Sequence, residues 1–183
     1  HVWRLLKERG CRRGRPRPAL RIPVRGRRAV LEAIAERVAH SCPEEEVVYV
    51  DEADIDLNPR IGLTYLKPGQ QSCVLTPGKN VKRYVAAALN ARTGTLISLE
   101  GPRKNSALFI NLLHRLRFAY RRSRVIHVVL DNYIIHKSRR TNEAIDRLDG
   151  RIKLHFLPPY SPESNPVERL WKQMHDHVTR NHR

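Results

Sequence analysis

The chain has 183 residues, of which 40% are hydrophobic, so it can fold as one domain with an arm, and wholesale disorder is excluded. It carries 35 Lys or Arg against 18 Asp or Glu, and the resulting net charge of +17 indicates a polyanionic partner, most simply nucleic acid. No apolar run reaches the ~20 residues that span a bilayer, so no membrane partner is expected. Three cysteines without a CxxC pair indicate a reducing compartment.

The first 28 residues form a basic arm, with eleven Lys or Arg against one acid, Glu8. Residues 2–9 are predicted to end a helix at Gly10, and the Gly and Pro residues of 12–18 predict an extended linker. Residues 28–40 have helical spacing, with an apolar stripe of Val30, Ile34 and Val38 that would dock on the domain. We therefore expect an arm over residues 1–44 and a folded domain over residues 45–183.

The domain alternates strands with helices. The predicted elements are a strand at 47–50, a hairpin of strands at 84–89 and 95–99, a helix at 105–122, a strand at 125–130, a helix at 138–148, a strand at 152–157 and a helix from 165 onward. Two strand–helix–strand passages imply that part of the sheet is parallel. The expected fold class is α/β, a mixed sheet flanked by helices.

Two predicted strands end in an acid, Asp51 and Asp131. The carboxyl ends of strands are where open α/β sheets form their sites, so we expect both carboxylates to face one crevice. A divalent cation relieves the repulsion between two such groups, and hard oxygen ligands suit Mg²⁺ or Mn²⁺.

A third acid, Glu168, has two interpretations. With Asn165 as N-cap and Pro166 as the first helical residue, it falls at the third helical position, where a capping-box acid is common. A carboxylate at a helix N-terminus is also held ionised by the backbone dipoles, which suits a metal ligand.

Three blocks of sequence belong together: VYVDEA at 48–53, VLDNYIIHKS at 129–138 and LPPYSPESNPVERLW at 157–171. They resemble the catalytic domain of mariner-like DDE transposases, in particular the bacterial insertion-sequence branch. The 36 residues between Asp131 and Glu168 are close to the spacing of that family. The third block is the most specific and argues against another RNase H-like nuclease that acts on RNA or hybrids.

The resemblance implies an RNase H-like fold behind an extended basic N-terminal arm. It implies Asp51, Asp131 and Glu168 as catalytic residues and as ligands of Mg²⁺ (or Mn²⁺), with two ions. The implied reaction is DNA strand cleavage and strand transfer at transposon ends during DNA transposition, by in-line attack of a water or a DNA 3′-hydroxyl. The implied partners are double-stranded DNA and a second copy of the chain, and the implied location is the bacterial cytoplasm, associated with DNA.

Basic residues in two segments are candidate DNA contacts: Arg12, Arg13, Arg15, Arg17, His136 and Lys137. The segment Gly14-Arg15-Pro16-Arg17 resembles the core of an AT-hook, which lies in the minor groove of A·T-rich DNA, although a generic basic linker is the alternative. For His136 and Lys137 the two interpretations are a phosphate contact near the scissile bond and a polar helix start.

Other acids and a tryptophan near these blocks are given ordinary roles. Glu52, Asp54 and Asp56 are expected to be solvated turn acids, with Glu52 pointing away from Asp51 because side chains alternate along a strand. Glu163 is a weaker candidate than Glu168 because it lies in a Pro-bounded loop. Trp171 is expected to be a packing anchor.

The chain also differs from the family pattern at both ends. It begins at His1 without a Met, and only fifteen residues follow Glu168. Family members usually carry two helix-turn-helix modules upstream, so residues 2–9 are read as the end of one and the chain as truncated at its N-terminus. This leaves an alternative function open, a catalytically inactive basic DNA-binding remnant of a transposase.

Overall fold

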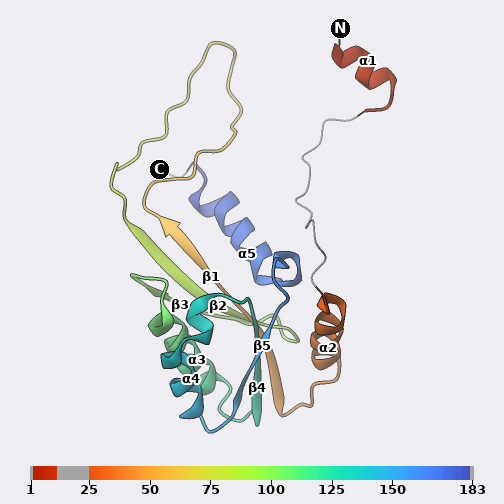
Figure 1. Cartoon of the computed structure of the whole chain (residues 1–183). Helices are drawn as coiled ribbons and strands as arrows, with labels where there is room; N and C mark the ends of the chain where they lie inside the picture. The colour runs from red at the N-terminus through yellow and green to blue at the C-terminus, as the bar shows by residue number, and fades with distance from the viewer. Residues whose placement is uncertain (1, 12–24, 182–183) are drawn as a thin grey trace.

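The computed structural model describes residues 2–11 and 25–181, and in that part of the chain a five-stranded mixed sheet lies between layers of helices (Figure 1). The strands are β1 (Glu45–Asp56), β2 (Lys82–Asn90), β3 (Leu96–Gly101), β4 (Val125–Leu130) and β5 (Ile152–Phe156). Their order in the sheet is β3-β2-β1-β4-β5. Pairing is antiparallel from β3 to β1 and parallel from β1 to β5, so the expected mixed α/β sheet is confirmed.

The predicted helices are also found. They are α1 (Val2–Glu8), α2 (Arg27–Ala39), α3 (Ser106–Ala119), α4 (Arg139–Asp146) and α5 (Val167–Met174). Short 3-10 helices, η1 (Ile134–Lys137) and η2 (Pro162–Ser164), stand before α4 and α5, and a π-helical turn, η3 (His175–Thr179), continues α5. As predicted, Gly10 follows α1 in a left-handed conformation, at φ 71°. Residues 12–24, which include the candidate contacts Arg12, Arg13, Arg15 and Arg17, lie outside the described residues.

One face of the sheet is covered by α3, whose apolar stripe forms the main core. The Asn105 side chain caps the helix by accepting a hydrogen bond from the backbone N–H of Leu108. The most deeply buried side chains of the helix are Phe109, Leu112, Leu113 and Leu116. They pack against alternate residues of β1 and β4, including Val48 and Val128. Each such burial contributes about 1.5–3 kcal/mol.

The opposite face is covered by α2 and α5. Ile34 of α2 is buried against Val47 and Val129, as the predicted stripe requires. The predicted contact of Val30 is wrong, because this side chain is 39% exposed and Leu31 packs there instead. On α5, Trp171 packs in a cluster with Ala87 and Val167, which confirms it as an anchor.

The first strand is longer than predicted. It was expected to end at Asp51, but β1 runs on to Asp56, opposite Lys82 of β2. The extension forms because β2 continues to pair with β1 beyond the end of β4. Residues 57–81 then leave the sheet as a long loop (Figure 1). Asp51 therefore lies in the middle of a strand and not at its end.

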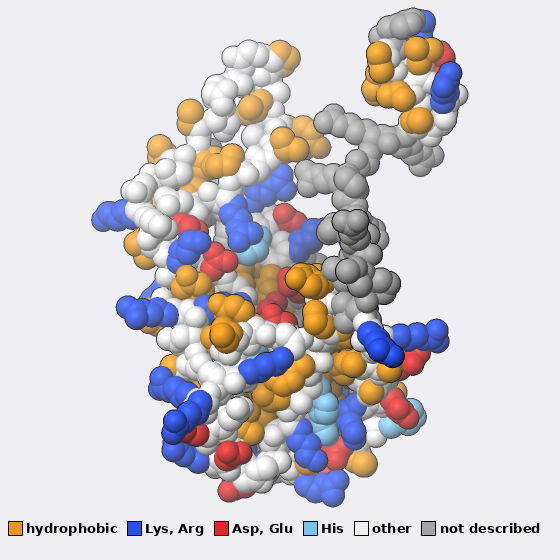
Figure 2. All heavy atoms as spheres, viewed as in Figure 1, with side chains coloured by type: hydrophobic (Ala, Val, Ile, Leu, Met, Phe, Trp, Pro, Cys, Tyr) orange, Lys and Arg blue, Asp and Glu red, His pale blue; other side chains and the backbone are white. Residues whose placement is uncertain are grey.

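Charged side chains are spread over the visible face of the molecule (Figure 2). Figure 2 shows Lys and Arg side chains scattered over this face, with Asp and Glu side chains between them. Within the described ranges, no helix has the length and apolar character needed to cross a membrane. The three cysteines, Cys11, Cys42 and Cys73, are free thiols at exposed positions.

Candidate functional site

The register of the parallel strands brings Asp51 and Asp131 together. In the β1–β4 pair, Tyr49 lies opposite Val129. Two residues farther along, the same register places Asp51 next to Asp131, which directly follows the last residue of β4. The two acids are therefore neighbours at the point where β4 ends and β1 continues.

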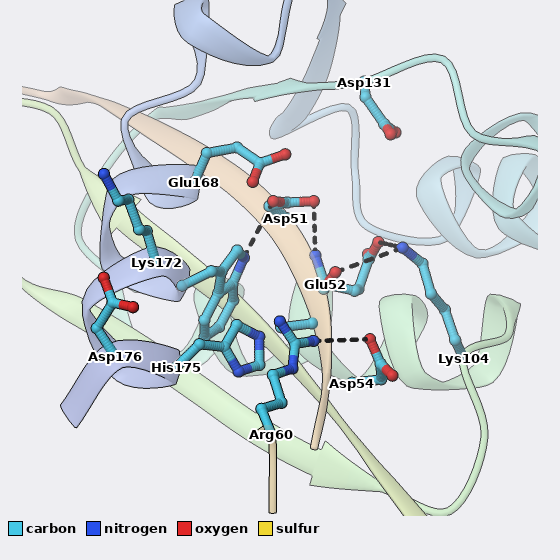
Figure 3. Close-up of a pocket in the computed structure, with 12 residues that line it drawn as sticks. Asp51, Glu52, Asp54, Arg60, Lys104, Asp131, Glu168, Lys172, His175 and Asp176 are labelled. Carbon is cyan, nitrogen blue, oxygen red and sulfur yellow. Dashed lines mark hydrogen bonds and ion pairs between the residues drawn. The ribbon is translucent and has the colours of Figure 1, made fainter. Parts of the chain in front are cut away.

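Glu168 completes the group from the first turn of α5. Asp51, Asp131 and Glu168 all line one pocket of about 540 Å³. In Figure 3 the Glu168 carboxylate lies next to that of Asp51, and Asp131 reaches toward them from the loop after β4. The structure thus brings the three predicted residues to one crevice.

Asp51 is held in a fixed orientation and is hard to ionise. The indole Nε1 of Trp171 donates to its Oδ2 at 3.0 Å, and the backbone N–H of Glu52 donates to its Oδ1 at 2.8 Å. Burial, followed by repulsion from the Glu168 carboxylate, raises the pKa of Asp51 to about 7. A bound cation would remove this repulsion.

The pKa of Asp131 is shifted in the opposite direction to that of Asp51. The Oδ1 atom of Asp131 accepts a hydrogen bond from the backbone N–H of Tyr133 at 2.9 Å and lies 3.1 Å from Nδ1 of His136. Burial by itself raises the pKa of Asp131, but the hydrogen bonds from His136 and Tyr133 outweigh it, and the pKa is lowered overall. Asp131 is therefore the readily ionised member of the pair of aspartates.

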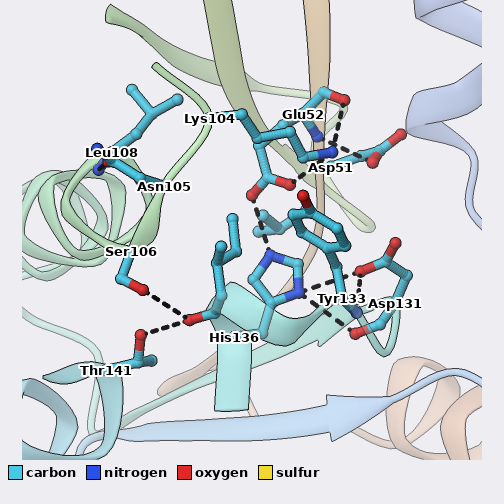
Figure 4. A network of polar contacts seen from close by, with 12 residues as sticks. Asp51, Glu52, Lys104, Asn105, Ser106, Leu108, Asp131, Tyr133, His136 and Thr141 are labelled. Carbon is cyan, nitrogen blue, oxygen red and sulfur yellow. Dashed lines mark hydrogen bonds and ion pairs between the residues drawn. The ribbon is translucent and has the colours of Figure 1, made fainter. Parts of the chain in front are cut away.

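A buried network links Asp131 to β1 (Figure 4). His136 Nε2 lies 3.0 Å from Oε1 of Glu52, and both side chains are 1% exposed. The prediction that Glu52 is a solvated turn acid is wrong: it points away from Asp51 as expected, but into the core under α3. The predicted phosphate contact of His136 is corrected as well, because its side chain is buried and both of its ring nitrogens already face carboxylates, those of Glu52 and Asp131.

Two lysines stand near this network. Lys104, before α3, lies 3.4 Å from Oε2 of Glu52 and 4.7 Å from the ring centre of Tyr133, and it lines the pocket. Lys137 is exposed and donates to the side chain of Asn132 at 2.6 Å. Its predicted contact with DNA remains a prediction.

The start of α5 separates the two interpretations of Glu168. The predicted N-cap is wrong by one residue: Pro166 is the N-cap of α5, and Asn165 stands before it, where its side chain accepts from the backbone N–H of Val167 at 3.2 Å and donates to the carbonyl of Val50 at 2.9 Å. In the predicted capping box the acid would bind the Asn165 N–H, but that group donates to the carbonyl of Pro162 at 3.0 Å. Glu168 is left facing the pocket.

The remaining acids have other partners. Glu163, the rival of Glu168, forms an ion pair with Arg27 of α2. Asp54 and Asp56 were expected in a turn, but both belong to β1 and pair with Lys82 at 3.1 Å and 3.9 Å. Their charges are thereby matched by a lysine on the neighbouring strand.

The architecture and the acid constellation agree with one known family. A family model described as "DDE superfamily endonuclease" matches residues 46–183. The chain belongs to this family. The DDE endonuclease assignment confirms the resemblance seen in the three sequence blocks.

Comparisons with individual proteins support this DDE endonuclease assignment. The chain is 44% identical over 181 residues to the "Insertion element IS630 uncharacterized 39 kDa protein" of Shigella sonnei, across 99% of the chain and 52% of that protein. A crystal structure of the Mos1 mariner paired end complex with Mn matches with a TM-score of 0.70 and 22% identity, over 100% of the chain and 57% of the Mos1 chain. The catalytic domain of Mos1 mariner transposase matches with a TM-score of 0.56 and 17% identity, over 88% of the chain and 74% of that domain. The chain thus spans about half the length of the first two, and the structural likeness confirms the RNase H-like fold.

The donor set of the DDE site fits a hard divalent cation. Its three side chains offer only carboxylate oxygens, which suit Mg²⁺ or Mn²⁺, and after burial the Glu168 carboxylate is the next largest cause of the raised pKa of Asp51. Across residues 2–11 and 25–181, no three His, Cys, Asp or Glu side chains are already gathered at metal-binding distances. Small movements of Asp131 or Glu168 would accompany binding.

Several pocket residues were not predicted from the sequence. Arg60, Lys104, Lys172 and His175 line the same pocket as the acids. Lys172 and His175 had a usable signal, because they lie four and seven residues after Glu168 and so on the same helix face. The others come from loops, where sequence periodicity gives no information.

Proposed function

We propose that this chain cuts and joins DNA strands at the ends of a mobile element, using residues 45–183 as the catalytic domain and the basic residues 1–44 as a DNA-binding arm. The observation that carries the proposal is the convergence of Asp51, Asp131 and Glu168 on one pocket of a DDE endonuclease domain. The relative from an insertion element supports the mobile-element context. Solved Mos1 complexes with a transposon end and with Mg support DNA and a divalent cation as partners.

In this proposal the three carboxylates bind two Mg²⁺ or Mn²⁺ ions. The protein acts in the cytoplasm of a bacterium. The cations would supply charge neutralisation at the scissile phosphate and a more acidic nucleophile. Asp131 stays ionised for this task because His136 donates to it. Asp51 is oriented by Trp171, which lies one turn after Glu168 on α5, so the helix positions two of the three acids.

Basic side chains of the pocket would hold the DNA strand. Arg60, Lys104 and Lys172 surround the acids and match the charge of a sugar–phosphate chain on either side of the scissile bond. The working complex is proposed to be a homodimer, as the resemblance to the transposase family implies.

The test is nicking of supercoiled plasmid DNA in the presence of Mg²⁺, Mn²⁺ or Ca²⁺. We expect nicking with Mg²⁺ or Mn²⁺ and binding without turnover with Ca²⁺, which coordinates too loosely for in-line attack. Asp131→Asn and Glu168→Gln should each lower the rate by at least about a hundredfold, because even residues behind the ligands contribute ten- to a hundredfold.

The matched control is Glu163→Gln, which changes the neighbouring acid paired with Arg27 and should leave the nicking rate within about twofold. If Glu168→Gln nicks as fast as the unmutated chain, the third ligand has been assigned wrongly. DNA binding without nicking under any metal, in a chain shown to be folded, would replace the proposal by the alternative of an inactive DNA-binding remnant.

A further inference from the structure

A second pocket adjoins the acids and differs in chemistry from the first. Its volume is about 590 Å³, and it shares Asp51, Asp131 and Glu168 with the first pocket. The rest of its lining is mainly aromatic and proline side chains from two loops: Tyr133, Leu157, Pro158, Pro159, Tyr160 and Pro162. The three acids therefore have a wall of mixed charge on one side, which includes the side chains of Arg60, Lys104 and Lys172, and a mainly apolar wall on the other.

Tyr160 is the unusual member of the apolar wall. It has a φ of 56°, in the left-handed region that non-glycine residues rarely adopt, and its side chain is 77% exposed. A strained backbone persists only where the surrounding structure imposes it, and such residues cluster at functional sites. Burial of the ring does not explain the strain here, because the ring is exposed.

The loop that carries Tyr160 is tied to the strands that carry the aspartates. At its start, the backbone N–H of Leu157 donates to the carbonyl of Leu130 at 2.8 Å. At its end, the Asn165 side chain donates to the carbonyl of Val50 at 2.9 Å. Leu130 and Val50 directly precede Asp131 and Asp51, so both ends of the loop that carries Tyr160 are anchored beside the two acids.

We propose that Tyr160 is a stacking platform for an unpaired base of the DNA strand, next to the phosphate that the three acids receive. The inference rests on the proposed DNA-cleaving function and deepens it. The Arg and Lys side chains of the first pocket suit the sugar–phosphate chain, whereas the apolar second pocket suits the face of a base. Aromatic side chains bind bases of any sequence by stacking, and a base at an already unpaired position is easily turned out of the helix.

Two variants separate the ring from the fold. Tyr160→Gly removes the ring and should melt at the same or a higher temperature, because glycine adopts a positive φ without strain. Tyr160→Phe keeps a ring that can stack. Phe118→Ala is the matched control, since Phe118 is also exposed, at 75%, but lies on α3, which packs on the other face of the sheet from α5.

The first measurement compares a blunt DNA duplex with a duplex that carries a short unpaired thymidine overhang, in Ca²⁺. We expect the unmutated chain, Tyr160→Phe and Phe118→Ala to prefer the overhang duplex. Tyr160→Gly should bind it about tenfold more weakly, the scale of one lost base–aromatic stack, with unchanged affinity for the blunt duplex. An equal preference in Tyr160→Gly, or none in the unmutated chain, overturns the inference.

The second measurement replaces the overhang thymidine with 5-iodo-2′-deoxyuridine and maps the photocrosslink by mass spectrometry. A crosslink at Tyr160 supports the inference, and a crosslink only at other residues overturns it. Neither measurement depends on cleavage. Absence of nicking would therefore sink the proposed catalytic function alone, whereas nicking without the Tyr160 crosslink would sink the stacking inference alone.

Discussion

Asp51 makes the protein sensitive to pH through its burial and its acidic neighbour. Its pKa is raised from an ordinary value of 3.8 to about 7, first by burial and then by Glu168. Between these two values the folded chain holds a proton that the unfolded chain has lost. The contribution of Asp51 to the free energy of unfolding therefore falls as the pH rises through that range.

We expect Asp51→Asn to reduce this loss of stability. Asparagine keeps the shape and the hydrogen bond from Trp171 but has no charge to bury. Urea unfolding at a series of pH values from about 4 to 7 should show a smaller decrease in the free energy of unfolding for the variant than for the unmutated chain. Equal decreases in the two proteins would show that Asp51 ionises normally and that its burial is less complete than in this structure.

Trp171 gives the site a built-in optical reporter, because the chain has two tryptophans and the other is Trp3 of α1. In a Trp3→Phe background, Mn²⁺ should quench the emission of Trp171, whose indole lies 3.0 Å from Asp51. Trp171→Phe should weaken Mg²⁺ binding by roughly tenfold in calorimetry, since it keeps an aromatic ring but loses the N–H that orients Asp51. Unchanged emission and unchanged affinity would show that the hydrogen bond does not orient a metal ligand.

At the scale of elements, the contact between Glu52 and His136 joins β1 to η1. Burial lowers the pKa of His136, but hydrogen bonds to Asp131 and Glu52 raise it more, to about 9. A histidine with a raised pKa adds stability that is complete below about pH 6.5 and is lost as the pH rises through about 9. The bridge is therefore strongest where both side chains are charged.

Glu52→Gln should destabilise the fold by about 3 kcal/mol at neutral pH, because it leaves a buried imidazolium with one fewer counter-charge. The fall in stability between about pH 6.5 and 9 should also become shallower, as measured by urea unfolding. The control is Asp54→Asn on the same strand, whose ion pair with Lys82 is 41% exposed on each side and contributes at most about 1 kcal/mol. Similar losses in both variants would mean that the buried bridge has no special weight.

At the scale of the whole molecule, the net positive charge is shared between the basic arm and the catalytic domain. Deletion of residues 1–24 removes eight Lys or Arg and one Glu but leaves α2 and its packing on the sheet intact. The slope of log affinity for duplex DNA against log salt should become smaller by several units, at about 0.9 per lost phosphate contact. An unchanged slope would place the DNA-binding surface on the domain, and a lost preference for A·T-rich duplex would identify the arm as a minor-groove binder.

Local patterns were sufficient to predict the elements and the placing of the three acids in one pocket. Strands and helices follow from the spacing of apolar residues, which each segment carries within itself. Glu168 was singled out because an Asn-Pro pair and the family block both mark the start of α5. The end of β1 was missed because the strand is extended by pairing with β2. The pair nearest in sequence, Asp56 and Lys82, is already 26 residues apart.

What only the tertiary structure decided is the state of the acids. Glu52 reads as a surface acid in the sequence, yet it is buried against His136, 84 residues away. The orientation of Asp51 depends on Trp171, 120 residues away. Contacts at such separations are set by strand register and by how helices pack on the sheet, and neither leaves a local pattern. The sequence by itself therefore determined which acids are the candidates, and the packing of β1 between α3 and α5 determined how they are oriented and how readily they ionise.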